Sequence, residues 1–140
     1  MLFAWCALFS GCAQSDSVEA ICLEENLVQK IGATIYQYDY VYITNLDWCP
    51  SCNMGFVEAF NKSNCDNILG IFLTQFESKK PLLTKQVSYP HARIFTIKEL
   101  QKQCDFHLPE AQLYHITDHH SFEQVDARSI YFKLEKCNEL

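Results

Sequence analysis

The chain has 140 residues, of which 49% are hydrophobic and 14% aromatic, so it can build one core and leaves little room for a second domain. Four glycines and four prolines exclude collagen-like and low-complexity sequence. The formal net charge is −6 and the 11 Lys and Arg are scattered, which excludes the basic stripe that a nucleic-acid-binding protein normally carries. We therefore expect one folded domain without a nucleic-acid partner.

Residues 1–12 (MLFAWCALFSGC) are uncharged and mostly apolar, and polar residues follow. Such a run is too short to span a bilayer but has the length of the apolar part of a signal peptide. Its end, Phe9-Ser10-Gly11-Cys12, resembles the lipobox of bacterial lipoproteins, in which the cysteine is acylated and becomes the mature N-terminus. The resemblance implies a lipid anchor at Cys12. A signal peptide cleaved elsewhere and a buried N-terminal helix are the alternatives.

The next segment, residues 13–32, contains apolar residues at helical spacing and ends at Gly32, which predicts a helix over 17–31. Residues 33–44 are rich in Ile, Tyr, Val and Thr, which predicts one or two strands, the later one (40–44) central in the sheet. Four tyrosines alternate through this region and predict one packed face: Tyr36, Tyr38, Tyr40 and Tyr42.

The remaining elements are predicted in a strand–helix–strand order. They are a helix from Pro50 to Asn61, a buried strand over 68–73, a loop over 76–90 that is polar, contains two prolines and can include one helical turn, a strand over 92–97, a helix over 98–104, paired strands over 110–116 and 122–125, and a segment over 128–136 that is either a strand or a helix. This order predicts an α/β fold with a mixed β-sheet flanked by helices.

The Cys49-Pro50-Ser51-Cys52 motif lies between the strand over 40–44 and the following helix. Proline suits the first helical position, because its fixed φ is helical and its missing N–H is not needed there. Cys49 then takes the N-cap position, where free N–H groups and the helix dipole stabilise a thiolate. A low pKa makes Cys49 a nucleophile at neutral pH and a good leaving group, and Cys52 can attack the resulting mixed disulfide.

An apolar strand that ends in Asp47-Trp48-Cys49-Pro50-Ser51-Cys52 and precedes an amphipathic helix resembles the WCxxC active site of the thioredoxin superfamily. The resemblance runs from about Tyr40 to Val125 and implies a thioredoxin-like domain over 33–140. It implies that Cys49 is the nucleophile, that Cys52 is the resolving thiol, that Trp48 and Pro50 contact the partner, and that neither a cofactor nor a metal is bound.

The resemblance extends to a second element of the family, the cis-proline opposite the CxxC motif. Leu108-Pro109 matches it in position, so Pro109 would shape the partner groove and Leu108 would contact the partner through its backbone. The segment 92–104 resembles the insertion of the TlpA-like, membrane-tethered branch. The chain departs from the family at Glu110, where Thr is usual, and at the hairpin turn, which lacks the usual Gly.

These features imply thiol–disulfide exchange with protein thiols and disulfides in the bacterial cell envelope, on the periplasmic side of a membrane anchor, with an upstream thiol-redox partner. Eight cysteines favour an oxidising compartment. A redox-inert interaction protein on the same scaffold is the competing hypothesis. A zinc site would need further ligands from His115, His119, His120 or Cys104, which lack a recognised spacing. Cys22, Cys65, Cys104 and Cys137 are predicted to be structural, and their pairing does not follow from the sequence.

Overall fold

The computed structural model describes residues 20–47, 50–100 and 111–139, with the backbone alone for residues 50–53. The described part begins with a helix over residues 20–31. The elements that follow are η1 (Ala33–Gln37), β1 (Tyr40–Asn45), α2 (Pro50–Lys62), β2 (Ile68–Thr74), η2 (Glu77–Lys79), α3 (Lys80–Gln86), β3 (Ala92–Thr96), α4 (Ile97–Leu100), β4 (Gln112–Ile116), β5 (Phe122–Val125), η3 (Ala127–Ser129) and α5 (Ile130–Asn138).

Five strands form one mixed sheet in the order β3-β2-β1-β4-β5. The first three strands in the chain are mutually parallel, whereas β4 runs antiparallel to β1 and β5 antiparallel to β4. All seven residues of β2 are buried, as expected for a strand covered on both faces. The predicted α/β class with a mixed sheet flanked by helices is confirmed.

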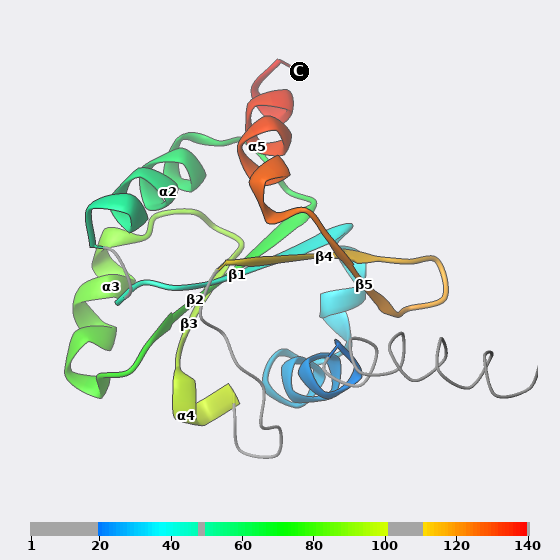
Figure 1. Cartoon of the computed structure of the whole chain (residues 1–140), viewed down its shortest axis with the longest axis horizontal. Coiled ribbons are helices and arrows are strands. Elements are labelled where there is room, and N and C mark those ends of the chain that lie inside the picture. The colour runs from blue at the N-terminus through cyan, green and yellow to red at the C-terminus, as the bar shows by residue number, and fades with distance from the viewer. Residues whose placement is uncertain (1–19, 48–49, 101–110, 140) are drawn as a thin grey trace, which may run out of the picture.

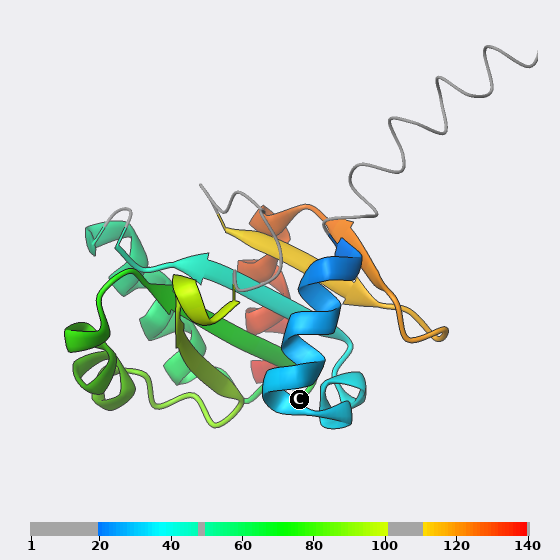
Figure 2. The ribbon, with the colours of Figure 1, turned by 90° about the horizontal axis from the view of Figure 1, so that it is seen from below.

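Helices cover both faces of the sheet. Figure 1 shows the sheet nearly edge-on, with α2 and α5 above it and the helix of residues 20–31 below it, and Figure 2 shows that helix crossing in front of the strands. Side chains alternate between the two cores: Leu69 and Ile71 of β2 pack with the helix of residues 20–31, whereas Ile68 and Phe72 pack with α2 and α5. The fold is therefore a three-layer sandwich.

Two of the predicted elements were wrong. Residues 33–37 form the 3₁₀-helix η1, because Gly32 takes a positive φ of 97° that ends the preceding helix and redirects the chain. Tyr36 and Tyr38 consequently pack in one core and Tyr40 and Tyr42 in the other, so the four tyrosines do not share a face. Residues 76–90, predicted as a loop with one helical turn at most, contain more helix than that, namely η2 and the seven-residue α3.

Other predicted elements agree with the structure. The strands over 68–73 and 122–125 and the helix from Pro50 match β2, β5 and α2 within one or two residues. The alternative left open for 128–136 is settled as the helix α5. The helix expected over 98–104 is present as α4 (Ile97–Leu100), and residues 101–104 lie outside the described part.

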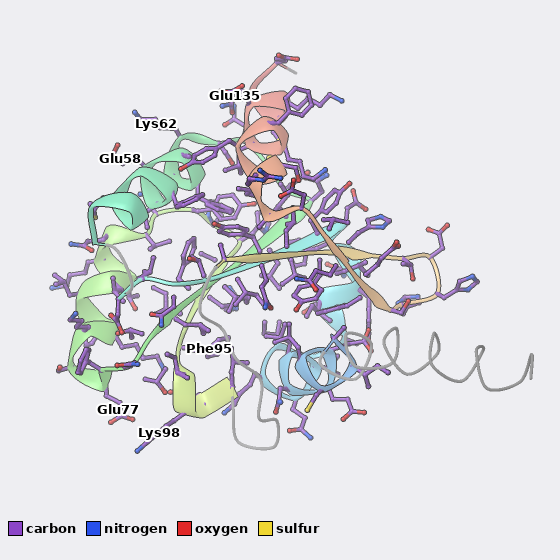
Figure 3. All side chains as sticks on the ribbon, in the orientation of Figure 1. Glu58, Lys62, Glu77, Phe95, Lys98 and Glu135 are labelled. Atoms are coloured by element: carbon purple, nitrogen blue, oxygen red, sulfur yellow. A yellow bond between two sulfur atoms is a disulfide. The ribbon has the colours of Figure 1, made fainter. Side chains whose placement is uncertain are left out.

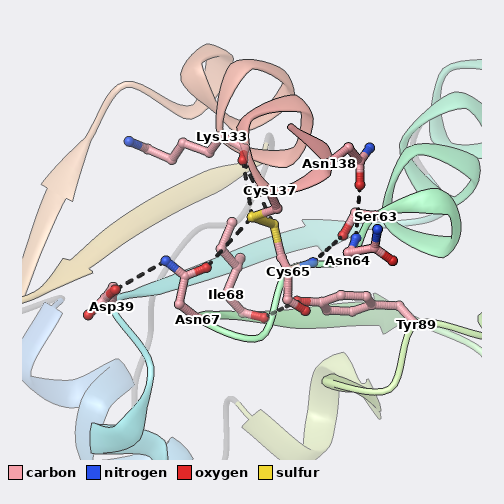
Figure 4. Close-up of a disulfide and its surroundings, with 10 residues drawn as sticks. All are labelled: Asp39, Ser63, Asn64, Cys65, Asn67, Ile68, Tyr89, Lys133, Cys137 and Asn138. Carbon is pink, nitrogen blue, oxygen red and sulfur yellow. Dashed lines mark hydrogen bonds between the residues drawn. A yellow bond between two sulfur atoms is a disulfide. The ribbon is translucent and has the colours of Figure 1, made fainter. Parts of the chain in front are cut away.

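A disulfide joins Cys65, in the loop before β2, to Cys137, in the last turn of α5 (Figure 4). The Tyr89 hydroxyl donates hydrogen bonds to the carbonyl oxygens of Cys65 and Ile68, at 3.2 and 2.5 Å. These bonds fix the loop that carries Cys65. Cys22 is disulfide-bonded as well. The predicted structural role of these three cysteines is confirmed, and Cys104 lies outside the described residues.

Candidate active site

The helix that follows the cysteine motif begins at Pro50, as predicted. Cys49 therefore directly precedes the first helical residue, and the backbone of Cys52 belongs to the first turn. Lys62 in the last turn complements the helix dipole, and the first turn contains no acidic residue whose charge would oppose a thiolate there. Trp48, Cys49 and the side chain of Cys52 lie outside what the structure describes, and the described backbone shows that α2 begins at Pro50.

The motif follows β1 at the carboxyl end of the parallel strands. Leu46 extends the pairing beyond the strand, because its N–H donates to the Leu73 carbonyl at 2.8 Å. Its side chain is buried under α2. In α/β sheets, ligands and partners commonly approach at the carboxyl ends of the strands. The motif thus lies at the end of the strands where reaction sites of α/β sheets are commonly found.

Asp47 anchors the segment that enters the motif. Its carboxylate accepts hydrogen bonds from the Thr74 hydroxyl, at 3.0 and 3.1 Å to its two oxygens, and from the Gln75 N–H at 2.6 Å. Lys79 Nζ lies 3.5 Å from Asp47 Oδ1. The Asp47 N–H donates to Asn45 Oδ1 at 3.0 Å, which forms a local turn. With both oxygens occupied, the carboxylate holds the residue before Trp48 against the end of β2.

Asp47 belongs to the motif that carries the resemblance, but the sequence pattern predicts no role for its side chain. The signal that could have found it is the Asn45-Leu46-Asp47 sequence directly after a strand, since Asn and Asp side chains stabilise such turns. Its hydrogen-bond partner Thr74 is fully buried at the end of β2.

Aromatic side chains hold α2 against the sheet and against α5. The fully buried ring of Tyr42 lies 5.7 Å from that of Phe56 and 5.4 Å from that of Phe60. Phe56 in turn stacks on Tyr131 of α5 at 4.8 Å. Burial raises the pKa of the Tyr42 phenol well above its usual range, and the nearby Tyr131 raises it further, so Tyr42 stays neutral. The helix that follows the motif therefore packs against uncharged aromatic side chains.

The histidines considered as metal ligands are spread over β4 and the turn after it. His115 lies on β4 with its ring 5.2 Å from that of Tyr40, and His120, exposed in the turn, has its ring 4.6 Å from that of Tyr36. His119 is exposed in the same turn. Among the described residues, no group of three or more His, Cys, Asp or Glu is arranged to hold a metal ion.

The remaining predicted site residues, Cys12, Leu108 and Pro109, lie outside the described residues. In the described ranges, no helix has the length and apolar character needed to cross a bilayer. No family model, no curated protein and no solved structure matches this chain. The class that the described residues define is an α/β protein with a mixed five-stranded sheet between helices, with a CxxC motif where β1 passes into α2.

Proposed function

We propose that the chain is a thioredoxin-like thiol:disulfide oxidoreductase whose Cys49–Cys52 pair exchanges electrons with cysteines of partner proteins. The observation that carries the proposal is the start of α2 at Pro50, directly after Cys49, with no acid in its first turn. A nucleophilic cysteine needs this position, because the free N–H groups of the helix lower the pKa of the thiol.

The order of elements around the motif supports the thioredoxin-like fold. The strand β1, the motif, α2 and the buried strand β2 follow one another, and the hairpin β4–β5 pairs with β1 on its other side. The added edge strand β3 lies in the segment that resembles the TlpA-like insertion. Both features are those that the resemblance implies for the family.

The reaction is a pair of sulfur displacements. The Cys49 thiolate attacks one sulfur of a partner disulfide, the partner S–S bond breaks, and its other sulfur leaves as a thiolate that takes up a proton. Cys52, as a thiolate, then attacks Cys49 and releases the second partner thiol, which leaves a Cys49–Cys52 disulfide. The partner gains two electrons and two protons. The reverse sequence oxidises a partner dithiol, and an upstream thiol-redox partner resets the pair.

The compartment we propose is the bacterial cell envelope, on the periplasmic side of a lipid anchor at Cys12. The Cys65–Cys137 disulfide and the disulfide of Cys22 support it, since such bonds persist in oxidising compartments.

A trapping experiment tests the proposal. Cys52→Ser removes the resolving thiol, so partner proteins should accumulate in disulfides with Cys49 that a reductant releases. Cys49→Ser, the matched control, should trap nothing. Partner capture and phenotype that survive Cys49→Ser would contradict the proposal and favour the redox-inert interaction protein.

A further inference from the structure

A groove lies between α2 and α3, next to the cysteine motif. Asn61 connects the C-terminal ends of the two helices, which lie away from the motif. Its side-chain amide donates a hydrogen bond to the Gln86 carbonyl at 3.0 Å, and its amide oxygen accepts from the N–H groups of Ser88 and Tyr89 at 2.8 and 3.1 Å. At the end next to the motif, the Lys79 ammonium on the α3 side lies 3.5 Å from Asp47 Oδ1 on the motif side. The groove is therefore closed at its far end and reaches the motif at its near end.

The walls of the groove are apolar and partly open to solvent. Their apolar part is formed by Leu46, Met54 and Val57 on the α2 side and by Leu82 and Leu83 on the α3 side, and the polar residues Asp47, Lys79 and Gln86 complete the lining. Met54 and Leu82 are 45% and 56% exposed, so both side chains are open to solvent. In Figure 3 the labelled charged residues of α2, Glu58 and Lys62, project outward from the helix.

The size of the groove decides what fits. Its volume is about 190 Å³. This is smaller than the roughly 300–1,000 Å³ of pockets for free cofactors and metabolites. It is close to the roughly 150 Å³ cavity that accommodates a benzene ring. The groove therefore accommodates one aliphatic side chain. Because a side chain is part of a polypeptide, the ligand that this volume indicates is a segment of a protein.

The charge at the end of the groove next to the cysteine motif indicates a second property of the segment that binds there. Residues 79–86 contain three lysines and no acidic residue, in a chain of net charge −6. Lys80 pairs with Glu99 at 2.9 Å. The half-exposed Lys79 ammonium contacts a carboxylate already occupied by Thr74 and Gln75, so it keeps donors for another acceptor. Asp47 lines the same end of the groove, so an acidic side chain of the occupant would pair with the donors of Lys79 that Asp47 does not use.

We propose, on the basis of the proposed function, that the groove binds an extended segment of the partner protein beside its reactive cysteine. An aliphatic side chain of the partner enters between Met54 and Leu82, and a carboxylate of the partner contacts Lys79. The substrates are accordingly proteins whose target cysteine has an aliphatic and an acidic neighbour.

Peptide disulfides test this substrate class. In each short peptide, one cysteine forms a mixed disulfide with glutathione. Of the two positions varied beside this cysteine, one is Leu or Ser and the other is Glu or Lys. The exchange rate of the reduced protein with each peptide is divided by its rate with glutathione disulfide. We expect the Leu/Glu peptide to exceed the Ser/Lys peptide by about tenfold or more, as burial of one aliphatic side chain supplies.

Leu82→Glu and Met54→Gln should each abolish most of this preference, and Lys79→Ala should abolish the part that depends on Glu. Phe132→Glu is the matched control, because Phe132 is 65% exposed on α5 and should leave the ratio unchanged. Exchange with glutathione disulfide but without a Leu/Glu preference, or a preference that Leu82→Glu and Met54→Gln leave intact, overturns the groove assignment alone. Failure to exchange with any disulfide overturns the proposed function itself.

Discussion

The contact between Asp47 and Thr74 should be measurable as a coupling energy. The perturbation is a double-mutant cycle of Asp47→Ala and Thr74→Val. Thr74 is fully buried, the Asp47 side chain is 14% exposed, and the hydroxyl lies within 3.1 Å of both carboxylate oxygens. A hydrogen bond to a charged group contributes about 1.5–3 kcal/mol, so we expect a coupling in that range. The ion pair between Asp47 and Lys79 adds little to the stability that the Asp47 carboxylate supplies, since Lys79 is half exposed.

Urea unfolding of the four proteins gives the free energies of unfolding. The cycle cancels the hydrogen bond from the Phe76 N–H to the Thr74 hydroxyl, which both Thr74→Val variants lose. A coupling below about 0.5 kcal/mol would be within the range found for independent sites. That result would refute the conclusion that Asp47 anchors the motif to the end of β2. If Asp47 anchors the motif, Asp47→Ala should also slow the reaction of Cys49 with glutathione disulfide.

Three further changes follow from the packing and the charges. Replacing both Cys65 and Cys137 by Ala should lower the free energy of unfolding by up to about 4 kcal/mol, because the bond closes a loop of 72 residues; an unchanged urea midpoint would contradict this. Gly70→Ala should cost about 1–3 kcal/mol in the same assay, because its Cβ would lie 3.1 Å from the Phe72 ring, and a neutral effect would mean that the ring yields freely. Burial, and then the charge of Glu25, raises the pKa of the Glu24 carboxyl, so stability falls as the pH rises through the folded-state pKa. Glu24→Gln should therefore be more stable than wild type at pH 7, and the difference should vanish below about pH 4; a gain that persists in acid would contradict the assignment.

Local chemistry explains which elements could be predicted. Pro50 sets the start of α2 because proline suits the first helical position, and the short apolar run over 68–73 is typical of a strand buried on both faces. The same reasoning failed for α3. There Pro81 also lies in the first turn of a helix, and the partly buried Leu83 packs against the core, but the polar composition and two prolines had indicated a loop.

Non-local contacts explain what the sequence left open. Asp47 and Thr74 are 27 residues apart and meet only because β1 and β2 pair in parallel. Cys65 and Cys137 meet because α5 returns over the start of β2, and no local pattern records that path. The motif was therefore visible in the sequence, whereas the residues that anchor it and the groove beside it depend on the fold.

The most direct test of the account is the reduction potential of the Cys49–Cys52 pair. After equilibration in glutathione or dithiothreitol buffers and differential alkylation, trypsin releases residues 31–62, which contain Cys49 and Cys52 and no other cysteine. We predict a reversible two-electron transition between about −270 mV, the value of thioredoxin, and about −120 mV, the value of DsbA, while Cys65–Cys137 remains oxidised. A Cys49–Cys52 pair that never forms a disulfide, or that is reduced only when the protein unfolds, would contradict the account.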